Sequence, residues 1–188
     1  MDVGIQSLWI ILTVMVPGIV FYGTFRILLA VLGISFPFVA AIDASEYLSI
    51  SVIFAIMFTL QIFGIVIETI AFKIGPYKHK DPKYQEAFEK RYEIIATMDP
   101  DKDYHIERIV SQFFMSHNIA VGMVINLLWV IIYEFFILNR FDSSTLIVVF
   151  IFSIITLCSL YIPYNRFEQS CKALHAHIDK LKGDNIFF

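Results

Sequence analysis

The sequence has few charged residues, and four long stretches have none at all. Asp, Glu, Lys and Arg make up 16% of the 188 residues and are absent from residues 3–25, 47–67, 109–133 and 143–165. A helix rises about 1.5 Å per residue, so each stretch is long enough to cross about 30 Å of hydrocarbon. A chain of this length has no room for four spans and a separate soluble catalytic domain.

Cysteine is equally scarce, and the patterns typical of metal or catalytic sites are missing. Cys158 and Cys171 belong to no CxxC or CxxH arrangement, so neither a disulfide nor a zinc site is predicted. Asp99, Asp101 and Asp103 resemble the start of a calcium loop, but Tyr104 stands where that loop needs glycine. We therefore predict no metal and no cofactor.

Enzyme motifs are also absent. No Gly-rich phosphate loop, HExxH motif or Ser, His and Asp order occurs. An intramembrane enzyme using Glu68 and His117 as acid and base would lack a nucleophile or a metal cluster. We therefore predict that the protein is not an enzyme.

The charge-free stretches predict an all-α fold, a single integral membrane four-helix bundle over residues 1–188 with helical cytoplasmic extensions. The expected spans are residues 5–32, 46–72, 110–138 and 144–165, with a cytoplasmic helical connection at 73–109 and a cytoplasmic tail at 166–188. Eight Lys and Arg residues lie in that connection and four in the tail, whereas the two other connections contain only Arg140. Because Lys and Arg accumulate in cytoplasmic loops, both termini should be cytoplasmic in the inner (plasma) membrane.

The long connection carries the signals of a separate helix. Asp81-Pro82 is typical of a helix start, and residues 83–97 follow a helical pattern. Four residues of that helix, spaced as on one face, form an apolar stripe that we expect to bind a cytosolic protein: Tyr84, Phe88, Tyr92 and Ile95. Eight basic residues balance eight acidic ones between Lys73 and Arg108, which argues against direct nucleic-acid binding.

Lysines gather where the second span is expected to leave the membrane, namely Lys73, Lys78, Lys80 and Lys83. They could contact anionic lipid headgroups, and the positive-inside rule explains them equally well.

Polar residues inside the spans are functional candidates, because burying a charge in lipid costs at least about 2.5–3.5 kcal/mol near the bilayer centre. Counting from the span boundaries predicts three pairs at matched depth: Arg26 with Glu134, Gln61 with Asn126, and Glu68 with His117. These residues could form a polar conduit or gate, or they could simply hold helices together while Arg26 extends toward the surface.

Two spans contain small residues at informative positions. Gln61, Gly64 and Glu68 share one face of the second span, which should meet protein or water and could line the axis of a homo-oligomer. Pro17-Gly18 should kink the first span.

Three features carry a resemblance of layout: VPGIVFYG at Val16–Gly23, the long charged connection, and RIVSQFFMSHN at Arg108–Asn118. With these features the chain resembles the small four-span membrane subunits of prokaryotic antiviral defence systems of the Kiwa type. This resemblance implies a homo-oligomeric membrane sensor or anchor that recruits a cytosolic effector.

We therefore expect a homo-oligomeric, non-enzymatic membrane sensor or anchor whose partners are the lipid bilayer, further copies of itself and a cytosolic protein. The alternative is a gated ion channel or membrane-perturbing pore lined by Gln61, Glu68, His117 and Asn126.

Overall fold

The computed structural model describes residues 11–34, 50–74, 78–99, 103–139 and 142–183. Within these ranges the chain is helical and contains no strand. The elements are η1 (Ile11–Met15), α2 (Val16–Val31), α4 (Ile50–Ile74), α5 (Pro82–Glu89), α6 (Arg91–Ala96), α7 (Tyr104–Ile131), η2 (Ile132–Ile137) and α8 (Ser143–Gly183), where η marks a π-helical segment.

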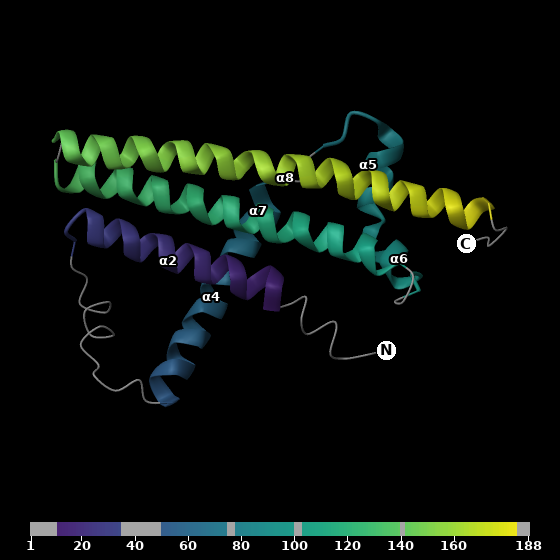
Figure 1. Cartoon of the computed structure of the whole chain (residues 1–188), viewed down its shortest axis with the longest axis horizontal. Coiled ribbons are helices and arrows are strands. Elements are labelled where there is room, and N and C mark those ends of the chain that lie inside the picture. The colour runs from purple at the N-terminus through teal and green to yellow at the C-terminus, as the bar shows by residue number, and fades with distance from the viewer. Residues whose placement is uncertain (1–10, 35–49, 75–77, 100–102, 140–141, 184–188) are drawn as a thin grey trace.

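Three helical segments are long and apolar enough to cross a membrane: Thr13–Val31, Tyr104–Ile137 and Ser143–Leu181. Helices α2, α7 and α8 lie side by side along the long axis of the molecule (Figure 1). The prediction of an all-helical protein with membrane-length helices is confirmed.

Helix α4 occupies the second predicted span but is arranged differently. It runs across α2 and α7 at a steep angle instead of alongside them (Figure 1). Its apolar segment within the residues described in full is Thr59–Ala71, which is shorter than the other three. A bundle of four spans therefore stays a prediction.

Local sequence signals explain several helix ends. The side chain of Asp81 accepts a hydrogen bond of 3.0 Å from the backbone N–H of Lys83, so Asp81 caps α5 as predicted. Gly33 has φ of +66° directly after α2, where Ile34 N–H donates to Leu29 O at 2.9 Å in a Schellman motif. Asn139 also has a positive φ, of 51°, between η2 and α8.

The amphipathic helix predicted at residues 83–97 is interrupted. At Lys90 the backbone leaves the helical conformation, with φ of −84° and ψ of 10°, and the segment divides into α5 and α6. This break takes Tyr92 out of the predicted stripe, and Tyr92 is 65% exposed.

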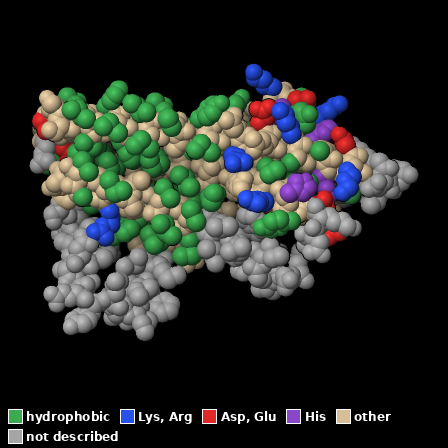
Figure 2. Space-filling view, viewed as in Figure 1, with side chains coloured by type: hydrophobic (Ala, Val, Ile, Leu, Met, Phe, Trp, Pro, Cys, Tyr) green, Lys and Arg blue, Asp and Glu red, His purple; other side chains and the backbone are tan. Residues whose placement is uncertain are grey.

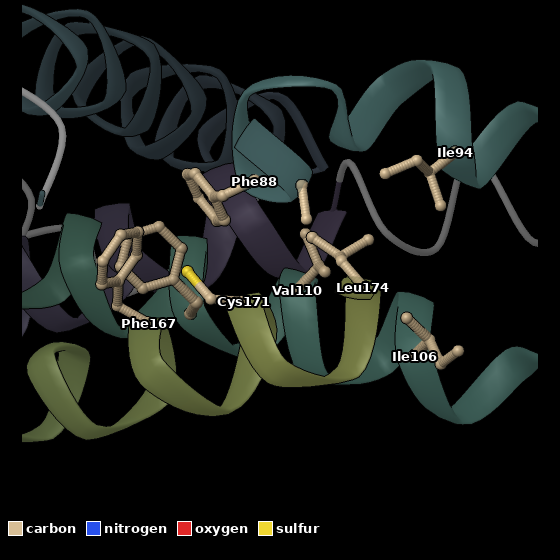
Figure 3. Close-up of a cluster of buried hydrophobic side chains, with 9 residues drawn as sticks. Phe88, Ile94, Ile106, Val110, Phe167, Cys171 and Leu174 are labelled. Atoms are coloured by element: carbon tan, nitrogen blue, oxygen red, sulfur yellow. The ribbon is translucent and has the colours of Figure 1, made fainter. Parts of the chain in front are cut away.

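The buried apolar side chains form separate clusters. Two lie among the membrane-length helices and α4, around Val130 and Ile67. A third, which we name the cap core, comprises Ala87, Phe88, Ile94, Ile106, Val110, Phe113, Phe167, Cys171 and Leu174 (Figure 3). It joins α5 and α6 to the first turns of α7 and the last turns of α8, and we name this assembly the helical cap.

Charge and apolar surface are segregated along the molecule. Hydrophobic side chains cover the part formed by α2, α7 and α8, whereas Lys, Arg, Asp, Glu and His side chains gather over the helical cap (Figure 2). On α8 alone, large apolar side chains from Leu146 to Ile162 are widely exposed. Apolar surface of this extent is expected of helices that face lipid.

Candidate functional site

Two asparagines of α7 attach that helix to the N-terminal helix. Nδ2 of Asn118 donates to Thr13 O at 3.0 Å, and Nδ2 of Asn126 donates to Phe21 O at 3.0 Å and to Thr24 Oγ1 at 2.7 Å. Both asparagines are almost completely buried. The predicted pair of Gln61 with Asn126 is therefore not formed, since Asn126 bonds to α2 while Gln61 is exposed on α4.

Glycines let α4 approach the N-terminal helix closely. A Cβ atom added to Gly18 would collide with the backbone carbonyl of Leu60, and one added to Gly64 would collide with that of Val14. Contacts of this kind between small residues hold membrane helices together by van der Waals packing. Gly64 therefore faces protein, whereas Gln61 and Glu68, which were predicted to share its face, are exposed.

His117 links α7 to the end of α4 through the backbone. Its Nε2 lies 3.1 Å from the carbonyl oxygen of Ala71. Glu68, the residue predicted to pair with it, is on the exposed side of α4 and joins no hydrogen bond with His117.

Glu134 is the most unusual polar residue of the membrane-length helices. Its relative exposure is 0%, and neither carboxylate oxygen has a hydrogen-bond partner. The predicted pair with Arg26 is therefore not hydrogen-bonded. The guanidinium carbon of Arg26 lies 6.0 Å from the centroid of the Tyr22 ring on its own helix.

The stripe predicted to bind a cytosolic protein is largely used within the chain. Phe88 is 3% exposed, and its ring contacts those of Phe167 and Phe113 at centroid distances of 4.8 and 5.4 Å. Tyr84 and Ile95 pack against the same cap core. Only Tyr92 stays outside, and the guanidinium carbon of Arg91 lies 4.4 Å from its ring centroid.

A groove remains open beside this core, between α5, α6 and the end of α8. Its volume is about 530 Å³. Three apolar side chains are surrounded by charged or titratable ones, and the lining residues are Lys83, Glu86, Ala87, Lys90, Glu93, Ile94, His175, Ile178 and Asp179. We name it the cap groove. Its charges have both signs, and Lys90 is paired with Glu86 at 2.8 Å, which raises the pKa of the Lys90 ammonium.

The turn before α7 meets the end of α8 at a buried polar contact that sequence reasoning missed. Nδ1 of His177 lies 3.6 Å from Oδ1 of Asp103, and both side chains are less than a tenth exposed. Lys180 approaches the same oxygen at 3.9 Å. Only spatial proximity could have linked Asp103 to His177, because Asp103 precedes α7 and His177 lies near the end of α8. No group of three potential metal ligands occurs among the described residues.

The lysines predicted to contact lipid headgroups are at the surface. Lys73, Lys78, Lys80 and Lys83 are all exposed, and Lys83 also lines the cap groove. Their positions are compatible with the predicted role, which stays untested.

Comparison with protein-family models, curated proteins and solved structures finds no match for this chain. Its function is therefore argued from the contacts described above.

Proposed function

We propose that the protein is a homo-oligomeric, non-enzymatic integral membrane sensor or anchor that binds a cytosolic protein through its helical cap. In this proposal the chain crosses the inner (plasma) membrane four times, and the cap and both termini face the cytoplasm. The exposed lysines next to α4 support this orientation, since Lys and Arg near span ends favour the cytoplasmic side.

The observation that carries the proposal is the continuity between the apolar helices and the cap. Helix α8 runs for 41 residues without interruption, although Pro163 lies inside it, and its last turns supply Phe167, Cys171 and Leu174 to the cap core. Helix α7 likewise enters the apolar region directly from the cap. Because the same rigid helices pass through both regions, a displacement within the membrane would move the cap.

The cap groove is the surface that we assign to the cytosolic partner. An apolar floor around Ile178 and Ile94, with charges of both signs at the rim, suits a helix or loop that presents an apolar residue between charged ones. Tyr92 is exposed on α6, the helix that also supplies Glu93 and Ile94 to the groove.

Charge reversal at the groove tests this assignment. Glu93→Lys should reduce the amount of partner that co-purifies with the membrane protein from its native cell. Glu89→Lys is the matched control. Glu89 is exposed on α5, a helix that borders the groove, but Glu89 itself does not line it. Equal recovery with both variants would contradict the proposal, provided that both are inserted and fold like the wild type.

Self-association is supported by the exposed polar residues of α4. Gln61 and Glu68 are exposed on a helix whose other exposed side chains include Ile62, Ile65 and Val66. Polar groups in lipid are costly, so this face is better covered by another copy than by acyl chains. Cross-linking of Gln61→Cys in membranes, with Cys171 replaced by Ser, should give dimers. The native Cys158, exposed on α8, should not.

The same exposed polar face favours a second candidate, a gated pore formed between copies. Planar-bilayer recording of the purified protein distinguishes the two functions. A stable conductance that is lost in Glu68→Gln would favour the pore, and the absence of conductance would favour the sensor or anchor.

A role in antiviral defence rests on the resemblance of layout. Cells carrying the gene with its native neighbours should resist phages better than cells carrying Glu93→Lys. Equal plating of phages on both strains would count against this role.

A further inference from the structure

The cap groove lies close to the end of α8. Its wall on that helix is formed by His175, Ile178 and Asp179, and α8 ends at Gly183. At a rise of about 1.5 Å per residue, Gly183 is about 6 Å beyond Asp179 and about 12 Å beyond His175. A chain that continues from Gly183 therefore starts within a short distance of the groove.

The sequence that follows α8 is short and mostly apolar. Residues 184–188 lie outside the described residues, and their sequence is Asp-Asn-Ile-Phe-Phe. An extended chain covers at most about 3.3–3.6 Å per residue, so Ile186, Phe187 and Phe188 can reach about 10–18 Å from Gly183. This reach is enough for these three side chains to return to the wall formed by α8.

The groove suits apolar side chains of this size. Its floor contains Ala87, Ile94 and Ile178. Its volume of about 530 Å³ falls within the range of about 300–1,000 Å³ of pockets that enclose a small ligand. Aromatic side chains gain more than most others from leaving water, because they bury a large apolar area. The groove thus offers residues 186–188 an apolar surface at a distance that they can span.

We propose that residues 184–188 fold back into the cap groove of their own chain, with Phe187 and Phe188 against Ile94 and Ile178. The segment then occupies the surface that we assign to the cytosolic partner, and it inhibits partner binding until it is displaced. The inhibitory role rests on the proposed function, whereas the docking itself does not.

The short connection makes such a contact competitive. A segment tethered a few residues away has an effective concentration on the order of millimolar at the groove, so a weak contact is enough to compete with a free partner. The same tether favours the groove of the same chain over that of a second copy.

Photo-cross-linking tests the docking without any partner. The photoreactive residue p-benzoylphenylalanine replaces Phe187 in the full-length protein, which is purified in detergent and irradiated, and the cross-linked peptides are identified by mass spectrometry. We expect cross-links to the peptides that contain Ile94 and Ile178, in a band of monomer size. Cross-links to these peptides in a dimer band would assign the segment to a second copy and overturn the proposal. Cross-links elsewhere, or none, would overturn it as well.

Two substitutions show whether the groove is the cause of the cross-link. Ile178→Arg places a charge on the apolar floor and should lower the yield about tenfold, because a buried charge without a partner is unfavourable. Glu89→Arg is the control, since Glu89 is exposed on α5 and does not line the groove, and it should keep the yield. Equal yields from both variants, with unchanged thermal unfolding, would contradict docking in the groove.

Recovery of the partner from the native cell tests the inhibitory role. Replacing both Phe187 and Phe188 by Ser should raise the amount of partner that co-purifies several-fold, whereas Glu93→Lys should lower it. If Glu93→Lys lowers recovery and the serine variant leaves it unchanged, the inhibitory role is wrong and the proposed function stands. If the cross-link forms and neither variant changes recovery, the docking stands, and the assignment of the groove to the partner is wrong.

Discussion

Nδ2 of Asn118 on α7 donates a hydrogen bond of 3.0 Å to the carbonyl oxygen of Thr13, 105 residues earlier in the chain. In a regular α-helix this carbonyl would accept from the residue at position 17, which is proline and has no N–H. The side chain of Asn118 therefore donates to a backbone oxygen for which Pro17 offers no N–H. Pro17 would weaken the first helix in isolation. In the folded protein it lies at a contact between two helices.

Replacing Asn118 by Leu should destabilise the protein by about 0.6–1.7 kcal/mol, the range measured for hydrogen bonds between membrane helices. Unfolding by a denaturing detergent in mixed micelles would measure the change. Ser116→Ala is the control, because the hydroxyl of Ser116 donates to Phe113 O on its own helix. A similar loss of unfolding free energy in both variants would show that the hydrogen bond to Thr13 stabilises the protein no more than one within α7.

Replacing Gly64 by Ala should separate α4 from the N-terminal helix, because the new Cβ would collide with the Val14 carbonyl. The expected cost is about 1–3 kcal/mol, typical of overpacked interiors. Gly23→Ala should not destabilise the protein, since a Cβ at Gly23 meets no atom within 4 Å. The same unfolding assay compares the two, and a tolerated Gly64→Ala would contradict the close approach.

Phe88 and Tyr92 should respond in opposite ways to truncation. Phe88→Ala removes a buried ring from the cap core and should cost about 3–5 kcal/mol. Tyr92→Ala removes an exposed ring in contact with Arg91 and should cost no more than about 1 kcal/mol. Limited proteolysis of the cap would report both effects. Comparable digestion of the two variants would indicate that the predicted stripe is not divided by the break at Lys90.

Cys171 should make the cap less stable in strong alkali. Burial raises the pKa of the Cys171 thiol from 9.0 to about 12, so the folded protein keeps a proton that the unfolded chain loses above pH 9.0. The stabilisation is fully present below pH 9.0 and decreases as the pH rises toward about 12. Melting temperatures measured across this interval should fall more steeply for the wild type than for Cys171→Ala. If the melting temperatures of the two proteins fall in parallel, the thiol does not contribute to the pH dependence of stability.

Several parts of the fold could be predicted because they depend on neighbouring residues. The cap of α5 by Asp81 needs only Pro82 and the backbone N–H that follows, and the turn after α2 needs only the positive φ that Gly33 adopts easily. The helix start at Asp81-Pro82 was predicted correctly for this local reason.

The pairing of polar residues could not be predicted from depth alone. Counting residues places Gln61 and Asn126 at similar heights only if α4 runs parallel to the other helices, and α4 instead crosses them. The direction in which each helix presents a residue also depends on the two π-helical segments, which no periodicity in the sequence indicated. For this reason Asn126 bonds to α2, and Glu134 is buried without a hydrogen bond.

The composition of this chain by itself determined its helical, membrane-compatible character, because long runs without charge have only a few stable arrangements in lipid. The tertiary structure alone decided which polar groups form hydrogen bonds with each other, which aromatic residues are buried in the cap core, and which carboxylate is buried. These outcomes depend on crossing angles and helix rotation, which are set by contacts between residues far apart in the sequence, such as Gly64 with Val14 and Asn118 with Thr13.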